Sequence, residues 1–273
     1  MMSELLNIIN TRRSVRTYDG RPLEPADREK LEQYMAGITN PFGVPVRFVL
    51  LDAEEHHLSS PVLAGETLYV AGLVDKVPHA DEAYGYSFEK LVLYAWSLGI
   101  GTVWIGGTMK REDFEQAAGL AEGERMPCIS PLGYPAAKMS LRETMMRKGV
   151  GATSRMPLDR IFFEESFERP ASAEALAALG DVAEMVRRAP SAVNKQPWRI
   201  VITPEGYHFY EKKDRGYVSD KTGDLQRIDV GIALCHFCMG MEEAGRKVQV
   251  KVQDPGLPVP DKVEYVATVT AEV

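Results

Sequence analysis

Apolar positions recur along the chain in two rhythms. Spacings of three and four residues are typical of helices, and alternating or continuous apolar runs are typical of strands. In the first part of the chain the pattern predicts helices over residues 3–10, 26–37, 86–101 and 111–120, and strands over 45–52, 102–107 and 128–136. Ser3 is the expected cap of the first helix. The charged, Met-rich segment 139–160 is expected to form an extended arm that crosses to the rest of the chain.

The second part repeats this order. It predicts helices over residues 171–188 and 229–245, and strands over 197–203, 207–212, 248–254 and 262–273. The two parts can be aligned without a gap at a constant offset of 152 residues, which pairs Pro45 with Pro197 and Arg47 with Arg199 (197 − 45 and 199 − 47). We therefore predict an α+β fold with two related helix-sheet halves, residues 1–150 and 151–273, packed as a pseudo-dimer in one compact unit.

Composition and charge narrow the class of protein. The 273 residues are 45% hydrophobic and 26% charged, with a formal net charge of −7. An acidic surface argues against nucleic acid or an anionic membrane as the main partner. No apolar run approaches the ~20 residues that span a bilayer, and the N-terminal charges follow the apolar part, the reverse of a signal peptide. With only three cysteines, these features predict a cytoplasmic protein.

Cys235 and Cys238 form a C-x-x-C pattern around His236. The pattern allows a metal or redox site, but it lies in an apolar helical stretch without a second cysteine pair. We therefore expect packed core thiols and a core histidine. The other histidines show no ligand-like spacing, so no metal site is predicted.

The segment Arg12-Arg13-Ser14-Val15-Arg16 places a dense set of donors just after the first helix. Guanidinium groups bind phosphate oxygens in a bidentate manner, and the serine hydroxyl adds a neutral hydrogen bond. This pattern favours a phosphate site. A solvated basic surface at the end of a helix is the alternative.

The later segment APSAVNKQPW contains a second set of polar groups. Pro190 ends the preceding helix, because the residue before a proline avoids helical geometry. Ser191, Asn194 and Gln196 could then donate to and accept from a planar, heteroatom-rich ring. An ordinary helix-loop-strand connection explains these residues equally well.

Glycines mark a third segment, LGIGTVWIGG. Gly106 and Gly107 would let the backbone approach a ligand closely. Their spacing, after a helix and not before one, does not match a dinucleotide-binding fingerprint. Taken alone, the glycines fit simple turn chemistry.

Together, RRSVR, APSAVNKQPW, LGIGTVWIGG, the turn Gly133-Tyr134-Pro135 and GATSRMPLDRIFF resemble the FMN-dependent nitroreductase family. In that family one subunit supplies the arginine cluster and the other the Pro-Ser-x-x-Asn-x-Gln-Pro loop. Here the first half has GITNPFGVPV at the loop position, and the second half has EESFERPAS at the arginine position. Each half keeps what the other lacks, so the chain resembles a fused, single-chain branch of the family.

The resemblance implies an FMN-dependent NAD(P)H oxidoreductase with one FMN per chain between the halves. Hydride transfer through flavin N5 to a nitroaromatic, quinone or similar small acceptor would follow ping-pong order, and no catalytic side chain is required. The implied phosphate contacts are Arg12, Arg13, Ser14, Arg16 and Arg155. The implied ring contacts are Pro190, Ser191, Ala192, Asn194 and Gln196, with the backbone of Trp104, Ile105, Gly106 and Gly107 near N5.

Two departures from the family pattern remain. Thr153 stands where many members carry a lysine, a loss for which Arg147 or Lys148 could compensate, and no motif locates contacts from segment 63–76 to the pyrimidine edge of the flavin. The alternative function is a flavin-binding or sensing protein without turnover. Because the duplication makes a dimer unnecessary, we expect a monomer, with a homodimer as the alternative.

Overall fold

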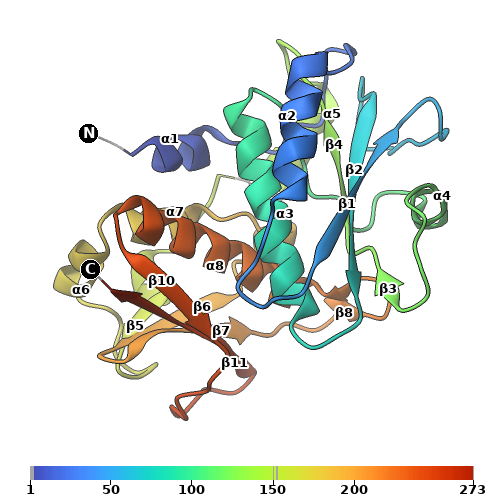
Figure 1. Ribbon diagram of the computed structural model, residues 1–273. Helices are drawn as coiled ribbons and strands as arrows, with labels where there is room; N and C mark the ends of the chain where they lie inside the picture. The colour runs from blue at the N-terminus through green and yellow to red at the C-terminus, as the bar shows by residue number, and fades with distance from the viewer. Residues whose placement is uncertain (1–2, 150, 152, 273) are drawn as a thin grey trace.

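A central pair of long helices, α3 (Ala80–Ser97) and α8 (Leu225–Glu243), separates two sheets in the computed structural model of the chain (Figure 1). The structure describes residues 3–149, 151 and 153–272. The predicted boundary between the halves follows residue 150, which lies outside the described residues. No helix among the described residues has both the length and the apolarity needed to cross a membrane.

The first sheet is antiparallel and is centred on β2. Its strands are β1 (Val46–Asp52), β2 (Leu68–Asp75), β3 (Glu124–Arg125) and β4 (Ile129–Leu132). Strand β2 pairs with β1 along one edge and with β3 and β4 along the other. The sequence prediction missed β2, although its continuous apolar run is typical of a strand covered on both faces. The helices of this half are α1 (Glu4–Thr11), α2 (Pro25–Ala36), α3, α4 (Arg111–Ala117) and α5 (Leu141–Gly149).

The second sheet has the strand order β10-β11-β7-β6-β5 and is antiparallel except for the β5–β6 pair. Its strands are β5 (Phe162–Glu164), β6 (Trp198–Thr203), β7 (Gly206–Lys212), β10 (Lys247–Lys251) and β11 (Val263–Glu272). The remaining elements are α6 (Ala173–Leu179), α7 (Asp181–Arg188), α8, the short helices η1 (Leu158–Arg160) and η2 (Ala192–Asn194), and the strands β8 (Val218–Ser219) and β9 (Gly223–Asp224).

The two halves follow one topology. The order α2-β1-β2-α3-β4 in the first half corresponds to α7-β6-β7-α8-β11 in the second, and the middle strand of each set pairs with both others. Helices α2 and α7 end 152 residues apart (188 − 36), and strands β1 and β6 begin 152 residues apart (198 − 46). These positions fit the predicted offset; internal duplication stays a prediction.

Helices α3 and α8 approach each other at two glycines. A Cβ atom on Gly85 would collide with the backbone carbonyl of Ile228, and a Cβ atom on Gly231 would collide with that of Glu82. The two contacts are reciprocal, because both helical pairs are 146 residues apart (231 − 85 and 228 − 82). Such reciprocity is what a two-fold axis between related halves produces.

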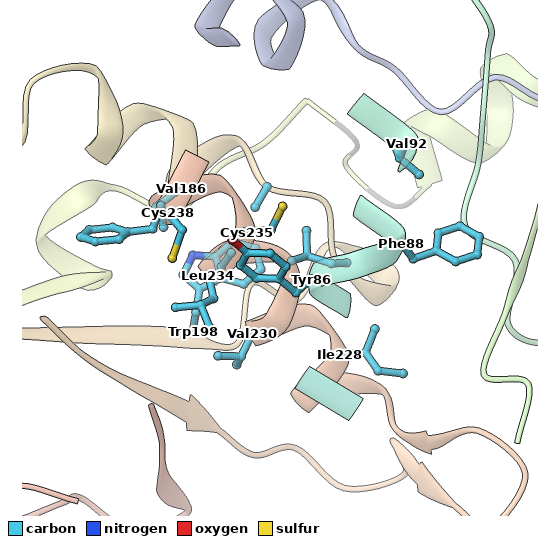
Figure 2. Close-up of a cluster of buried hydrophobic side chains, with 14 of the residues drawn as sticks. Tyr86, Phe88, Val92, Val186, Trp198, Ile228, Val230, Leu234, Cys235 and Cys238 are labelled. Atoms are coloured by element: carbon cyan, nitrogen blue, oxygen red, sulfur yellow. The ribbon is translucent and has the colours of Figure 1, made fainter. Parts of the chain in front are cut away.

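A shared hydrophobic core surrounds this crossing. It includes Tyr86 and Phe88 of α3, Trp198 of β6, and Cys235 and Cys238 of α8 (Figure 2). Both thiols are buried, and burial raises their pKa values, which keeps them protonated and unreactive. The prediction of packed core thiols is confirmed.

Three sequence predictions of local structure need correction. Segment 139–160 is not extended throughout, because it contains α5, whose first turn is capped where the Glu143 amide donates to Ser140 Oγ at 3.1 Å. Segment 171–188 is not one helix, since Gly180 has φ +56 and separates α6 from α7. Segment 102–107 forms isolated bridges at Thr102 and Ile105 and no regular strand.

The glycine crossing yields a test of the fold. Changing Gly85 or Gly231 to Ala should lower the free energy of unfolding by about 1–3 kcal/mol, because the added methyl group forces the two helices apart. Gly149→Ala, where an added Cβ meets nothing, is the matched control and should not destabilise the protein. Urea unfolding measures the three variants. Equal stability of Gly85→Ala and Gly149→Ala would contradict the close crossing.

Candidate functional site

Segments from both halves enclose a cavity of about 450 Å³. The first half contributes the chain after α1, the turn at 103–107, and Arg147 of α5. The second half contributes Arg155, the loop 190–194 and the start of α8. The volume lies in the range of small-molecule and cofactor sites. Residues distant in sequence therefore meet at one place.

Twelve of the fourteen predicted site residues line this cavity. They are Arg12, Arg13, Ser14, Arg16, Trp104, Gly106, Gly107, Arg155, Pro190, Ser191, Ala192 and Asn194. The other two, Ile105 and Gln196, do not. The amide and carbonyl of Ile105 are already paired with those of Ile129 at 2.9 Å, and Gln196 is buried beneath the loop. Direct contacts between these twelve residues and a ligand stay a prediction.

Arginines dominate one side of the cavity. Arg13 forms an ion pair with Glu143 at 2.9 Å, and Glu143 also accepts a hydrogen bond from Thr17. In the described part of the chain, no carboxylate lies within ion-pair distance of Arg12, Arg16 or Arg147. Three cations of this wall therefore have no ion-pair partner among the described residues.

The pKa values record the same imbalance. Burial lowers the pKa of Arg12, and the nearby Arg147 lowers it further, while Glu89 raises it. Burial, Arg12 and Arg188 lower the pKa of Arg155 to about 10. Like charges in a partly desolvated site disfavour one another. An anion in the cavity would relieve this repulsion.

The loop between α7 and β6 has a strained backbone. Val193, Asn194 and Gln196 all have positive φ, an uncommon conformation for residues other than glycine and especially for β-branched valine. The Gln196 amide donates to Ser191 Oγ at 2.9 Å, and this bond closes the loop. Strain of this kind concentrates at functional sites, where surrounding contacts maintain it.

The loop also holds the segment that carries Arg155. Asn194 Nδ2 donates to the carbonyls of Gly151 and Ser154 at 2.9 and 3.0 Å. Gln196 Oε1 accepts a hydrogen bond from the Met156 amide at 2.8 Å. Asn194 and Gln196 were predicted as ring contacts. In the structure their side chains bind the backbone on both sides of Arg155 and so fix its position.

Asp229 is a functional candidate that sequence reasoning missed. It lies in the first turns of α8, and it is the sole acidic side chain among the lining residues that the structure describes. Both carboxylate oxygens accept the Ala192 amide, at 3.0 and 3.1 Å, so Asp229 holds the loop. Burial raises the pKa of Asp229 well above its usual value. An acid directly before the long apolar run that starts at Val230 was the available signal.

Apolar groups and free backbone donors form the rest of the wall. Val103, Trp104, Ile228 and Ile232 also line the cavity, and sequence reasoning identified only Trp104. In the described part of the chain, the Gly107 amide has no acceptor within hydrogen-bond distance. The cavity thus offers a cationic region, an apolar wall and unused N–H donors.

Arg147, a suggested substitute for the missing lysine near Thr153, is one of the lining residues, while Lys148 is not.

No group of three or more His, Cys, Asp or Glu side chains in the described residues is arranged to hold a metal ion. His236 is a buried histidine, bonded to Glu89 and to the Met185 carbonyl.

Comparisons with known proteins identify relatives of the chain. A family model described as "Putative TM nitroreductase" matches residues 4–241. A crystal structure from Thermotoga maritima, described as a "putative nitroreductase", is 20% identical, covers 98% of this chain and 94% of its own, and superimposes with a TM-score of 0.62. This likeness confirms the predicted α+β fold of the nitroreductase type. Among curated proteins, none matches the chain.

Smaller solved structures match about half of the chain. One from Bacteroides thetaiotaomicron, described as an NADH dehydrogenase/NAD(P)H nitroreductase, is 21% identical and covers 51% of this chain and 91% of its own, with a TM-score of 0.44. An FMN-dependent nitroreductase from Clostridium difficile is 17% identical and covers 52% and 94%, with a TM-score of 0.42.

The buried acid at the cavity gives a test in the FMN-free protein. When folding raises the pKa of a carboxyl, the free energy of unfolding of the protein falls as pH rises above the unfolded pKa of ~3.9. The reason is that the carboxyl ionises first in the unfolded state. Asp229→Asn keeps an acceptor for Ala192 and removes this titration. From pH 4 to 7 the variant should gain stability relative to the parent, by at most ~1.4 kcal/mol per pH unit. Urea unfolding across this range measures it, and a difference that shrinks with pH would contradict the assignment.

Proposed function

This chain belongs to the nitroreductase family of oxidoreductases, and we propose that it binds one FMN in the cavity between its halves and works as an NAD(P)H-dependent oxidoreductase. The observation that carries the proposal is the wall of arginines, of which Arg12, Arg16 and Arg147 have no carboxylate partner in the described residues. A dianionic phosphate supplies the charge that this wall lacks.

The remainder of the cavity suits the flavin ring. Trp104, Ile228 and Ile232 offer apolar surface, and the backbone at Gly106 and Gly107 has no side chain to block a planar ligand. Ser14 and Ser191 add hydroxyl groups. A phosphate at one end and a ring with polar edges over the apolar wall together describe FMN better than a free phosphate or a purely apolar ligand.

The chemistry that FMN supplies is hydride transfer at N5, first from NADH or NADPH and then to a nitroaromatic, a quinone or a similar small acceptor, in ping-pong order. The residues of the chain would bind the FMN and orient its ring. Arg12, Arg16, Arg147 and Arg155 would hold the phosphate. The loop 190–194, fixed from below by Asp229, would lie against the ring. No side-chain acid or base is assigned a catalytic step.

We further propose a monomer with a single site, because both halves of the site come from one chain. A homodimer through an outer face would leave this arrangement unchanged.

The phosphate assignment yields a selective prediction. Arg12→Ala should weaken FMN binding by about 1.5–3 kcal/mol, the value of a charged hydrogen bond, and should leave riboflavin binding almost unchanged. Titration of FMN-free protein with each flavin measures both affinities. Arg28→Ala is the matched control, because Arg28 is exposed on α2, pairs with Glu32, and is not among the lining residues. If Arg12→Ala and Arg155→Ala both bind FMN like the parent, the phosphate assignment is wrong.

Flavin stoichiometry and reduction test the function as a whole. The purified chain, supplied with FMN if it is pale, should release one FMN per chain on denaturation, and its visible spectrum should bleach with NADH or NADPH under anaerobic conditions. Two FMN per chain would contradict the single site. A yellow protein that neither donor reduces would favour a flavin-binding or sensing protein without turnover. A chain that takes up no FMN would refute the proposed function.

A further inference from the structure

A buried acid and histidine connect the centre of the fold to the cavity. Glu89 of α3 and His236 of α8 are both fully buried, and their side chains meet at 3.0 Å across the helix pair. The other oxygen of Glu89 accepts the indole N–H of Trp104 at 3.1 Å. Trp104 lines the cavity. Glu89 therefore bonds at the same time to the opposite half and to a cavity wall.

The bonding pattern restricts the protons of this pair. His236 Nδ1 lies 2.8 Å from the Met185 carbonyl, which can only accept, so Nδ1 carries a proton. Oxygen Oε2 of Glu89 accepts from Trp104. One proton remains for the bond between Glu89 Oε1 and His236 Nε2. If it resides on the histidine, a carboxylate faces Trp104 and an imidazolium stands behind it.

The same carboxylate acts on the arginine wall. Glu89 raises the pKa of Arg12, in opposition to burial and to Arg147. At this depth charges are poorly screened, so a carboxylate bonded to the cavity-wall residue Trp104 lowers the positive potential of the cationic region. The indole of Trp104 is also packed against Phe88, with ring centroids 4.7 Å apart, which leaves it little freedom to leave its acceptor.

We infer that Glu89 is a positioning and charge-tuning residue: it holds Trp104 in the cavity wall, and, paired with His236, it presents a negative charge to that wall. This inference rests on the proposed function as far as the flavin is concerned. A reduced flavin ring carries more negative charge than an oxidised one, so a carboxylate near the site makes the bound flavin harder to reduce. Without Glu89 the site would hold anions more tightly.

Glu89→Gln separates charge from geometry. The amide oxygen of the new side chain can still accept from Trp104, and its NH₂ group can donate to a neutral His236. The geometry is kept, and the carboxylate charge at the cavity wall is removed together with the charge of the imidazolium behind it. In FMN-free protein, inorganic phosphate should then bind more tightly, by roughly three- to tenfold. In the FMN-loaded protein the midpoint potential should shift to more positive values.

The control is Glu82→Gln, on the same helix. Glu82 is buried, forms an ion pair with Arg227 at 3.1 Å and does not line the cavity, so neither phosphate affinity nor the potential should change.

The outcomes decide between the two proposals. If Glu89→Gln leaves phosphate affinity and potential at parent values, or if Glu82→Gln shifts them as far as Glu89→Gln does, the inference is wrong. If the parent chain binds phosphate but no FMN, the proposed function fails, and the phosphate measurement alone still tests Glu89. Trp104 fluorescence, identified by subtraction of the Trp104→Phe signal, should be the same in the parent and in Glu89→Gln, because the indole keeps its acceptor.

Discussion

The close crossing of α3 and α8 is the constraint on which the rest of the structure depends. With no side chain at Gly85 or Gly231, each helix rests on the backbone of the other. This short separation brings the two halves together along a common core. It also decides where the site forms, because Trp104 follows α3 while Ile228 and Asp229 belong to α8 itself. A wider crossing would separate the apolar wall from the loop-bearing wall.

A polar belt supports the crossing at the end of the helix pair. Arg227 of α8 reaches Glu82 of α3 at 3.1 Å and Glu211 of β7 at 2.7 Å. Asp81 of α3 accepts the Asp224 amide at 3.0 Å and pairs with Arg125. These buried charges are paired inside the protein, because an unpaired buried charge would strongly destabilise the fold. Arg12, Arg16 and Arg147 at the cavity are the exception, since the described residues place no carboxylate within ion-pair distance of them, and that contrast distinguishes a binding site from an ordinary ionic network.

The site residues that belong to local sequence motifs could be predicted from the sequence. The residues that reach the cavity only through tertiary packing could not. The arginine cluster and Pro190 to Asn194 were identified because their residue types and order carry the chemistry. Asp229, Ile228 and Ile232 were not, since the face of α8 that meets the cavity depends on how α3 crosses it. For Gln196 the residue type was informative, but positive φ values in its loop turn the side chain away from the cavity. Helix α5 could have been predicted from the sequence, because Ser140 and Glu143 form a capping-box pattern. Strand β2 was missed although its apolar run is continuous.

The proposed single site agrees with the residues that the predicted duplication pairs. At the offset of 152 residues, Arg12, Arg13 and Arg16 correspond to Glu164, Glu165 and Glu168, while Ser14 corresponds to Ser166 (164 − 12 and 166 − 14). The charge of the cluster is thus reversed, and carboxylates there would repel a phosphate.

The loop that we propose to face the flavin differs from its paired segment in the opposite way. Asn194 corresponds to Phe42 and Gln196 to Val44 (194 − 152 and 196 − 152), and both apolar side chains pack against the main hydrophobic core. At the paired positions one cluster has carboxylates in place of cations, and the opposite loop has apolar side chains in place of polar ones. A second site would therefore lack both a phosphate anchor and ring contacts. Both missing elements belong to the same site, so the other site keeps its full set. The predicted pairing of the halves therefore fits the proposal of one functional cavity, for which the remaining segments serve as scaffold.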